Sequence, residues 1–577
     1  MEQLEVRKTL INAIENDSLL GILSDFEFKA VRAEESVIIK ELISLHNESR
    51  FDLNEQFRQL DDRNNPYDLM YIYCAALPEL TCSVVDVIDV FQHVKENKLP
   101  DANFHEFYVQ FCKQDIERPK VALSYLLDKP EERNELIQTT LFSAAELDSK
   151  WVMAQFSDLI QHPNPSVRRQ IYLAIGRMPL VDGCSAEERF ELLDKAYYSE
   201  NNSMAKSGIV RAVGFLAKNT PDLWLGVNQI LDSCLGAKEA ETIHEAAYLL
   251  CFECKSAPDS TVDLLISYVK HTSPKNQDTF NLITIVIRNA INAEKYDVAE
   301  NLLKSLLLKN EGVTIDFFSH LAHEISNKEN NTFLNLIVTK WFLSGEVKLY
   351  EAIHDLVSST GLSGNELSID KSVLPLTDKK ILFLSKKVIS WFYLQPISAI
   401  SYLFSIFPHA SSNIKIQIEQ LIYDPLLLSY MGKSKRYIQD KLESIDDENI
   451  RISIHRLLSN LDSYCSDISE ANSVKELLSP QREADLYWKD FNTKLSQSID
   501  HSKKGSIMEL VGTQTILYGR DVIGHIHTGH ETKRSINTMQ TFSQSTEMPK
   551  MDIIDPEGLN IMLRVFRTER FNNEVDS

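Results

Sequence analysis

The chain has 577 residues, of which 43% are apolar and 25% are charged, and its formal net charge is -23 at pH 7. This composition excludes a disordered or fibrous chain, and the negative charge argues against attraction of the whole molecule to a nucleic-acid backbone. Only 18 Gly and 18 Pro are present, so the residues of tight turns are scarce and long helices are favoured.

The N-terminal sequence MEQLEVRKTL lacks the apolar core of a signal peptide. The most apolar stretch, residues 388–407, is broken by Gln395, Pro396 and several serines, which favours a pair of buried helices over a membrane span. The eight cysteines are scattered through apolar helical surroundings, as is typical of reduced core residues. We therefore expect a cytoplasmic protein that makes no contact with a membrane.

Apolar residues recur every three or four positions over most of residues 1–500, which predicts amphipathic helices. Polar residues suited to helix starts punctuate this pattern. Asp68 is expected to cap one helix, and Ser185 is expected to cap another that begins at Ala186 and carries Glu188 in its first turn. These signals predict long helices joined by short polar turns.

The predicted organisation has four parts and one break between them. In chain order, the parts are an N-terminal helical region (1–130), helical repeats (131–356), a second helical region (377–500) and a small α+β module (501–577). Residues 357–376 carry Ser, Thr, Gly and Asp together with Pro375, and are predicted to be a linker or a long loop. The expected fold class is mainly α with a small β-containing module at the C-terminal end.

An internal repeat is the most informative feature. The segments VRRQIYLAIG (167–176), AKSGIVRAVG (205–214) and IHEAAYLLCF (243–252) align at a constant offset of 38 residues. Their first, fifth and eighth positions are apolar or small and lie on one helical face. These expected seam residues are Val167, Ile171, Ala174, Ala205, Ile209, Ala212, Ile243, Ala247 and Leu250. Because one hairpin cannot cover its own apolar face but stacked copies can, the repeat predicts an α-solenoid of stacked helical hairpins.

The run NPSVRRQIYLAIGRM (164–178) resembles the second helix of HEAT-type repeats. The residues that carry the resemblance are Asn164, Pro165, Val167, Arg168, Ala174, Ile175 and Gly176. It covers residues 160–270 best and weakens on either side, and unrelated hairpins that happen to stack are the alternative. HEAT-type proteins are adaptors and scaffolds more often than catalysts, so the resemblance implies a role in binding.

Helical spacing is lost between Leu510 and Pro549. Runs of β-favouring residues flank residues 519–521, which predicts a hairpin with its turn there, and residues 535–545 offer a third strand. Asp555, followed by Pro, is expected to cap a final helix.

The sequence GHIHTGH (524–530) is the sharpest candidate for a chemical site. His525 and His527 would project from one side of a strand, and His530 could return across the turn, so three imidazoles could hold zinc or another transition metal. The alternative is a solvated strand or an interface, because no distant fourth ligand has the usual spacing. Cys251 and Cys254 also lack a second ligand pair and are expected to be core residues.

Arg564, Arg567 and Arg570 recur every three residues and predict a basic stripe on the final helix, which could bind a nucleic-acid backbone or an acidic partner. A solvated face is the alternative. Five further arginines lie in the repeats, where interspersed glutamates argue against a dedicated basic groove. They are Arg168, Arg169, Arg177, Arg189 and Arg211.

The sequence contains no phosphate-binding loop, dinucleotide-binding glycine motif, HExxH helix or nucleophile elbow, so we expect no cofactor and favour a non-catalytic role. The tail DPEGLNIMLRVFR resembles the ends of bacterial helical-repeat proteins that accompany ATPases or nucleases in anti-phage defence loci, which implies a subunit of a multi-component assembly. The expected function is a scaffold or adaptor that binds other protein subunits. A nucleic-acid-binding solenoid and a metal-dependent enzyme built on the histidine cluster are the alternatives.

Overall fold

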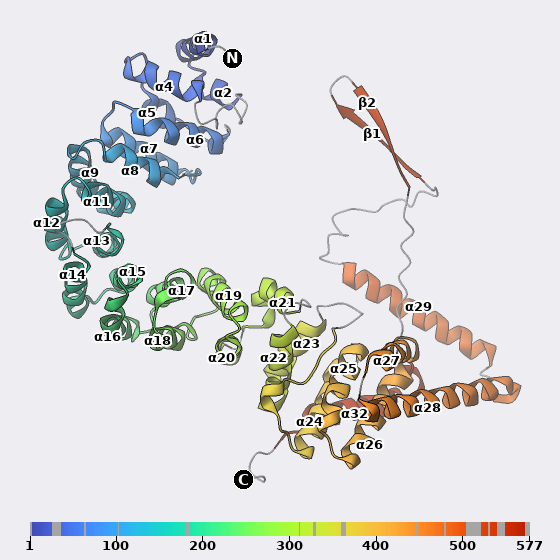
Figure 1. The fold of residues 1–577 in the computed structure, drawn as a ribbon. Coiled ribbons are helices and arrows are strands. Elements are labelled where there is room, and N and C mark those ends of the chain that lie inside the picture. The colour runs from blue at the N-terminus through green and yellow to red at the C-terminus, as the bar shows by residue number, and fades with distance from the viewer. Residues whose placement is uncertain are drawn as a thin grey trace. The chain divides into compact units, whose positions relative to one another are not determined.

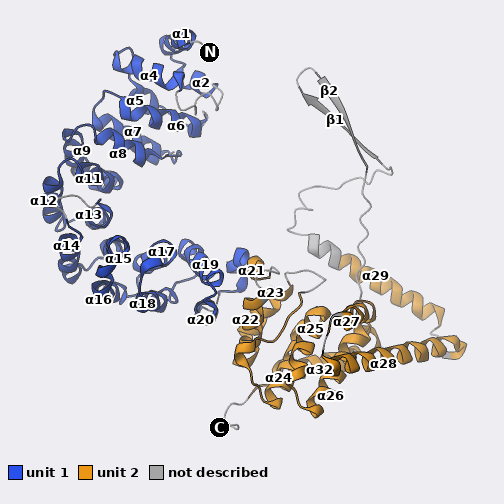
Figure 2. Ribbon diagram, in the orientation of Figure 1, with its two compact units in different colours: residues 1–321 blue, residues 322–577 orange. Residues whose placement is uncertain are grey.

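The computed structural model describes residues 3–25, 36–62, 65–101, 103–179, 185–310, 312–326, 331–358, 365–445, 447–477, 480–503, 521–528, 531–538 and 549–571. The chain is mainly helical and divides into two compact units, residues 1–321 and residues 322–577 (Figure 2). The finer division into four parts stays a prediction. Within the described residues, no helix is long and apolar enough to cross a membrane.

Unit 1 is a succession of short to medium helices. They are α1 (Gln3–Glu15), α2 (Leu19–Ser24), α4 (Val37–Asn47), α5 (Leu53–Phe57), α6 (Pro66–Ala76), α7 (Val84–Glu96), α8 (Phe104–Cys112), α9 (Glu117–Asp128), α10 (Pro130–Arg133), α11 (Ile137–Ala145), α12 (Ser149–Leu159), α13 (Pro165–Arg177), α14 (Ala186–Ser199), α15 (Ser203–Asn219), α16 (Trp224–Leu235), α17 (Ala240–Phe252), α18 (Asp259–Val269), α19 (Gln277–Asn292) and α20 (Tyr296–Lys309). Helix α21 (Ser319–Ser326) spans the boundary between the units.

The repeat region of unit 1 alternates between two rows of helices. Helices α11, α13, α15, α17 and α19, here called the odd row, pack side by side in chain order (Figure 1). Helices α14, α16 and α18 pack in the same order in the other row, and each odd helix also contacts the even helix that follows it. The core lies between the rows, an arrangement consistent with an α-solenoid.

The predicted seam residues lie where odd-row helices meet. All are buried except Leu250, which is half-buried, while its neighbour Leu249 is fully buried. The first two segments end in glycines that permit close approach: a Cβ on Gly176 would lie 2.5 Å from the Ala212 Cα. The third segment has Phe252 at the glycine position, and in α17 it is Leu249 that fills the contact with α15 at Gly214.

Two of the three predicted helix caps are confirmed. Ser185 and Glu188 form a capping box at the start of α14. Asp555 accepts a hydrogen bond from the backbone N–H of Gly558 and caps the final helix. The prediction for Asp68 is wrong, because α6 begins at Pro66 and Asp68 lies inside its first turn.

Unit 2 contains the remaining helices and a two-stranded sheet. They are α22 (Asn331–Ser344), α23 (Val347–Ser358), α24 (Asp378–Phe392), α25 (Pro396–Ile406), α26 (Ser412–Leu421), α27 (Met431–Ser444), α28 (Glu448–Ser473), α29 (Gln481–Lys503), β1 (Asp521–Thr528), β2 (Glu531–Thr538), α31 (Met551–Ile554) and α32 (Pro556–Thr568).

Residues 365–370, in the described part of the predicted linker, form an extended strap held between α22 and α25, and a short 3-10 helix (Lys371–Val373) follows. Four consecutive backbone N–H groups donate alternately to side chains of the two helices. The bonds are Leu367 N to Ser401 Oγ (2.8 Å), Ser368 N to Asn335 Oδ1 (2.9 Å), Ile369 N to Ser405 Oγ (2.8 Å) and Asp370 N to Thr339 Oγ1 (3.1 Å). Leu367 and Ile369 are buried, so residues 365–370 are part of the packed unit.

The hairpin differs from the prediction in its register. β1 and β2 are antiparallel and pair Asp521 with Thr538 and Thr528 with Glu531, so Asp521 begins a strand instead of lying in a turn. The predicted third strand supplies the end of β2. The prediction placed the turn at Gly519 because glycine is typical of hairpin turns. In the structure, residues 521–528 pair instead with residues 531–538, which follow them in the chain.

Helix α32 packs on α24 in unit 2, with Leu559 as its buried residue. The final helix thus belongs with the second set of helices. The described residues therefore do not support a compact β-containing module at residues 501–577. The physical reason is that the buried face of α32 finds a larger apolar surface on α24 than a single hairpin offers.

Candidate binding surfaces

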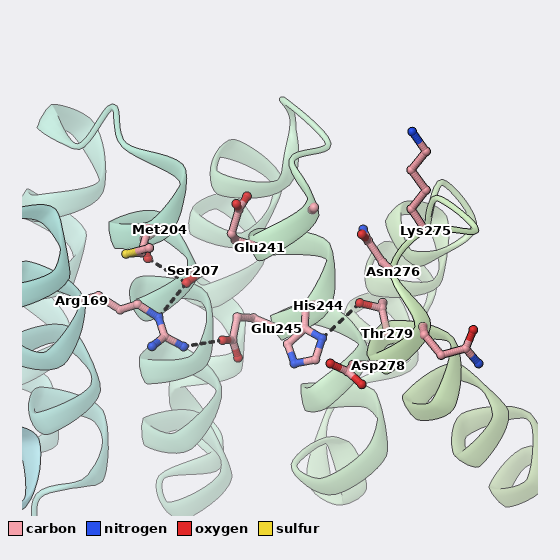
Figure 3. A pocket seen from close by; sticks show the side chains of 12 residues that line it. Arg169, Met204, Ser207, Glu241, His244, Glu245, Lys275, Asn276, Asp278 and Thr279 are labelled. Carbon is pink, nitrogen blue, oxygen red and sulfur yellow. Dashed lines mark hydrogen bonds and ion pairs between the residues drawn. The ribbon is translucent and has the colours of Figure 1, made fainter. Parts of the chain in front are cut away.

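A groove of about 500 Å³ crosses the odd row of unit 1 (Figure 3). Four successive odd-row helices contribute to it: α13, α15, α17 and the start of α19. Its central side chains are Arg169, Ser207, His244, Glu245 and Thr279. Since each comes from the same end of its helix, the groove is a direct product of the repeat.

An ion-pair network fixes the floor of this groove. Arg169 donates to Ser207 Oγ (3.0 Å) and to Glu245 Oε1 (3.0 Å). Arg211 donates to the other carboxylate oxygen of Glu245, whose side chain is almost completely buried. Beside them, His244 Nδ1 and Thr279 Oγ1 lie 3.1 Å apart and share a hydrogen bond between α17 and α19. The polar floor is therefore pre-oriented by contacts across three repeats.

A second buried pair joins α13 to the end of α14. Arg168 contacts Glu200 through two nitrogens, at 2.7 and 2.9 Å, and Tyr172 donates to the same carboxylate. Burial alone would raise the pKa of Glu200, but the pKa is lowered because Arg168 and the backbone N–H of Asn202 donate to it. Glu200 thus remains a charged link between helices.

The five repeat arginines serve mainly as internal links. Buried Arg189 donates to the carbonyls of Ile175 (3.1 Å) and Met178 (2.6 Å), at the C-terminal end of α13. Arg177 lies 4.7 Å from the ring centre of Phe215, on the next odd-row helix. With Arg168, Arg169 and Arg211 paired to carboxylates, this surface offers little uncompensated positive charge to a phosphate backbone.

The predicted arginine stripe lies on α32 and is used in part to dock that helix. Arg567 Nε donates to the carbonyl of Ser390 (2.9 Å), and its guanidinium lies 5.3 Å from the ring centre of Trp391. Arg570 donates to the carbonyl of Gly345 (2.5 Å). Arg564 is exposed. The three side chains therefore do not form one free basic face.

The sequence analysis missed the groove residues Ser207, His244, Glu245 and Thr279, and it also missed the role of Lys387. Lys387 is fully buried on α24, and its Nζ donates to three carbonyls at the C-terminal end of α32: Phe566 (2.8 Å), Arg567 (2.7 Å) and Glu569 (2.7 Å). A cation there satisfies orphan carbonyls and complements the negative end of the helix dipole. Burial lowers the pKa of this amine to about 8. The sequence contained one sign of this burial: Lys387 follows Leu384 by three residues and so lies on the apolar face of its helix.

The predicted metal site cannot be placed. His525 and His527 lie in β1, their side chains are outside the described residues, and so is His530 altogether. Elsewhere, the described part of the chain holds no group of three or more His, Cys, Asp or Glu that could bind a metal ion. Burial raises the pKa of both Cys251 and Cys254 to about 12, which keeps them as thiols.

Comparison with known proteins gives no relative: no family model and no curated protein sequence matches the chain. The class is therefore defined by the fold alone. The protein is a mainly helical one, whose first unit stacks helical hairpins in two rows.

Proposed function

We propose that the protein is a HEAT-like α-solenoid that acts as a non-catalytic scaffold or adaptor and binds another protein along the odd row of unit 1. The observation that carries this proposal is the groove. Four successive odd-row helices line it, so a ligand bound there would contact several repeats at once. Repeat proteins use such extended surfaces for binding. The tail's similarity to defence-associated proteins supports a place in a multi-component assembly.

The charges of the groove favour a protein partner over a nucleic acid. Arg169 and Glu245 compensate each other on the floor. At the rim, Lys275 is exposed beside Glu241 and Asp278, so both signs are present. A phosphate backbone needs several cations of one sign, whereas a protein segment supplies both charges and backbone hydrogen-bonding groups.

Site-specific photo-cross-linking of the full chain in its native cells tests the proposal. A photoreactive amino acid replaces Glu241 in the groove, and the matched control replaces Glu191, an exposed residue on α14 in the other row. We expect one protein to be cross-linked reproducibly from position 241 and not from position 191. The same products from both positions, or none from position 241, would contradict a binding role for the groove.

A further inference from the structure

Helix α29 is amphipathic, and no element in the described part of the chain covers its apolar face. None of its side chains from 481 to 497 is buried, and no described element packs extensively against it. Its large apolar side chains are exposed to unusual extents: Leu486 59%, Tyr487 44%, Trp488 57% and Leu495 46%. Because most helical stability in proteins comes from packing of the apolar face, such a helix requires a partner.

Four of the apolar residues of α29 form a regular seam. Ala484, Trp488, Phe491 and Leu495 follow one another at intervals of four, three and four residues, the spacing that places side chains on one face for helix pairing. The rings of Trp488 and Phe491 lie edge to face, 5.6 Å apart. The seam is thus a preformed aromatic ridge on a 23-residue helix that is ~34 Å long.

The preceding helix, α28, also has an uncovered apolar stripe, over the second half of its length. Ile450, Ile454, Leu457 and Leu461 are buried and form its packed stripe. The stripe continues at the same spacing to Ile468, which is 39% exposed, and nothing from residue 462 to residue 473 is buried. An apolar stripe that stabilises the unit therefore extends past it, uncovered.

We propose that α29 and the distal half of α28 form a homodimer interface, with a second copy of the chain as the occupant. Leu486 lies on the opposite face of α29 and does not count toward the interface. At ~150–250 Å² for a large apolar side chain, the exposed fractions of Tyr487, Trp488 and Leu495 leave roughly 300 Å² uncovered per chain. Two copies supply roughly 600 Å² from these three residues alone, and α28 with the polar flanks adds to this area toward the range of stable interfaces. A two-fold axis covers both identical seams at once.

Charge favours a second copy over a membrane. From residue 481 to residue 497, α29 carries three basic and three acidic residues, and Lys494 pairs with Asp490 at 2.7 Å. This local neutrality lets two copies approach although the whole chain carries a net charge of -23. Helices that lie on membranes are instead rich in Lys and Arg on their polar face.

The mass of the full chain in solution, measured by light scattering and sedimentation over a micromolar concentration series, tests the inference. We expect twice the chain mass of 66.0 kDa. Trp488→Glu should halve the mass, whereas Leu486→Glu, equally exposed but off the seam, should leave it unchanged. A wild-type monomer throughout the series, or a Trp488→Glu variant that stays dimeric, would overturn the proposal.

Two further measurements separate the alternatives. Among the described residues, no element packs extensively against α29, and the ring contacts of Trp488 are with Tyr487 and Phe491 of the same helix. The variant should therefore keep the circular dichroism of the wild-type chain, which separates loss of the dimer from unfolding. Flotation with vesicles of neutral and anionic phospholipid should recover no wild-type protein. Recovery that Trp488→Glu abolishes would assign the seam to a lipid surface and overturn the dimer.

Discussion

Arg169 on α13 and Glu245 on α17 form a 3.0 Å ion pair across the intervening helix α15, although 76 residues separate them in the chain. Glu245 also receives Arg211 from α15, so a single carboxylate ties three consecutive odd-row helices together. The same carboxylate lies on the floor of the groove. Stability of the repeat stack and shape of the proposed binding surface therefore depend on one residue.

Replacement of this carboxylate should weaken unit 1. In Glu245→Ala, two partly buried guanidinium groups lose their acceptor, and we expect a loss of about 1–3 kcal/mol in the free energy of unfolding. Chemical denaturation followed by circular dichroism measures it. Glu241→Ala, on the exposed side of the same helix, is the matched control and should change little. Equal stabilities of the two variants would contradict the structural role of Glu245.

Close approach of α13 and α15 gives a second prediction. An added methyl group at Gly176 meets the backbone of Ala212, so Gly176→Ala should destabilise the protein by about 1–3 kcal/mol. At Gly21, in α2, nothing lies within 4 Å of the added carbon. Gly21→Ala should therefore be neutral or stabilising by up to about 1 kcal/mol, because Ala favours helices. A melting temperature unchanged by Gly176→Ala would refute the tight packing.

Local sequence signals predicted the features that depend on neighbours in the chain. The capping box of Ser185 and Glu188 and the cap at Asp555 involve residues three positions apart. The 38-residue repeat identified the residues buried between odd-row helices. It failed at Leu250, which is half-buried: the third segment has Phe252 in place of the glycine, and Leu249 fills the contact at Gly214 instead.

Docking of α32 depends on Lys387. Lys387→Met removes the donor to three carbonyls at the C-terminal end of α32. A hydrogen bond from a charged donor contributes about 1.5–3 kcal/mol to stability. Helix α32 should therefore detach from α24 at least tenfold more often in the variant. Hydrogen exchange of residues 556–568 measures this. Lys386→Met loses a partly exposed pair with Glu569 and a contact with the Phe566 ring, and should have a smaller effect. Equal exchange in the two variants would contradict the role of the buried amine.

The pKa of Lys387 predicts a pH dependence with a definite sign. Burial lowers this pKa to about 8 in the folded chain, below the ordinary value of about 10.4. Between these values the unfolded chain binds more protons, so the lysine's contribution to the free energy of unfolding rises with pH from about 8 to 10 and is constant below that window. The stability difference between wild type and Lys387→Met isolates it. A difference that falls over this window would show the opposite shift.

The sequence analysis missed contacts made by residues far apart in the chain. Lys386 and Lys387 look like a surface pair, and only α32, about 180 residues later, explains why one of them is buried. The strap at residues 365–370 has the composition of a loop. Its hydrogen-bond partners lie on α22 and α25, outside the segment, so the sequence of the strap alone does not show that it is packed. Composition and spacing within one segment cannot report such partners.

The most direct test of the central claim is hydrogen exchange of the full chain with and without the protein that cross-links from position 241. A ligand held by the groove should protect the first turns of α15, α17 and α19 together, since all three contribute to it. Protection of these three helices at once is the predicted result. Unchanged exchange there, with protection only on α32 or the β1–β2 hairpin, would contradict a binding surface built from successive repeats.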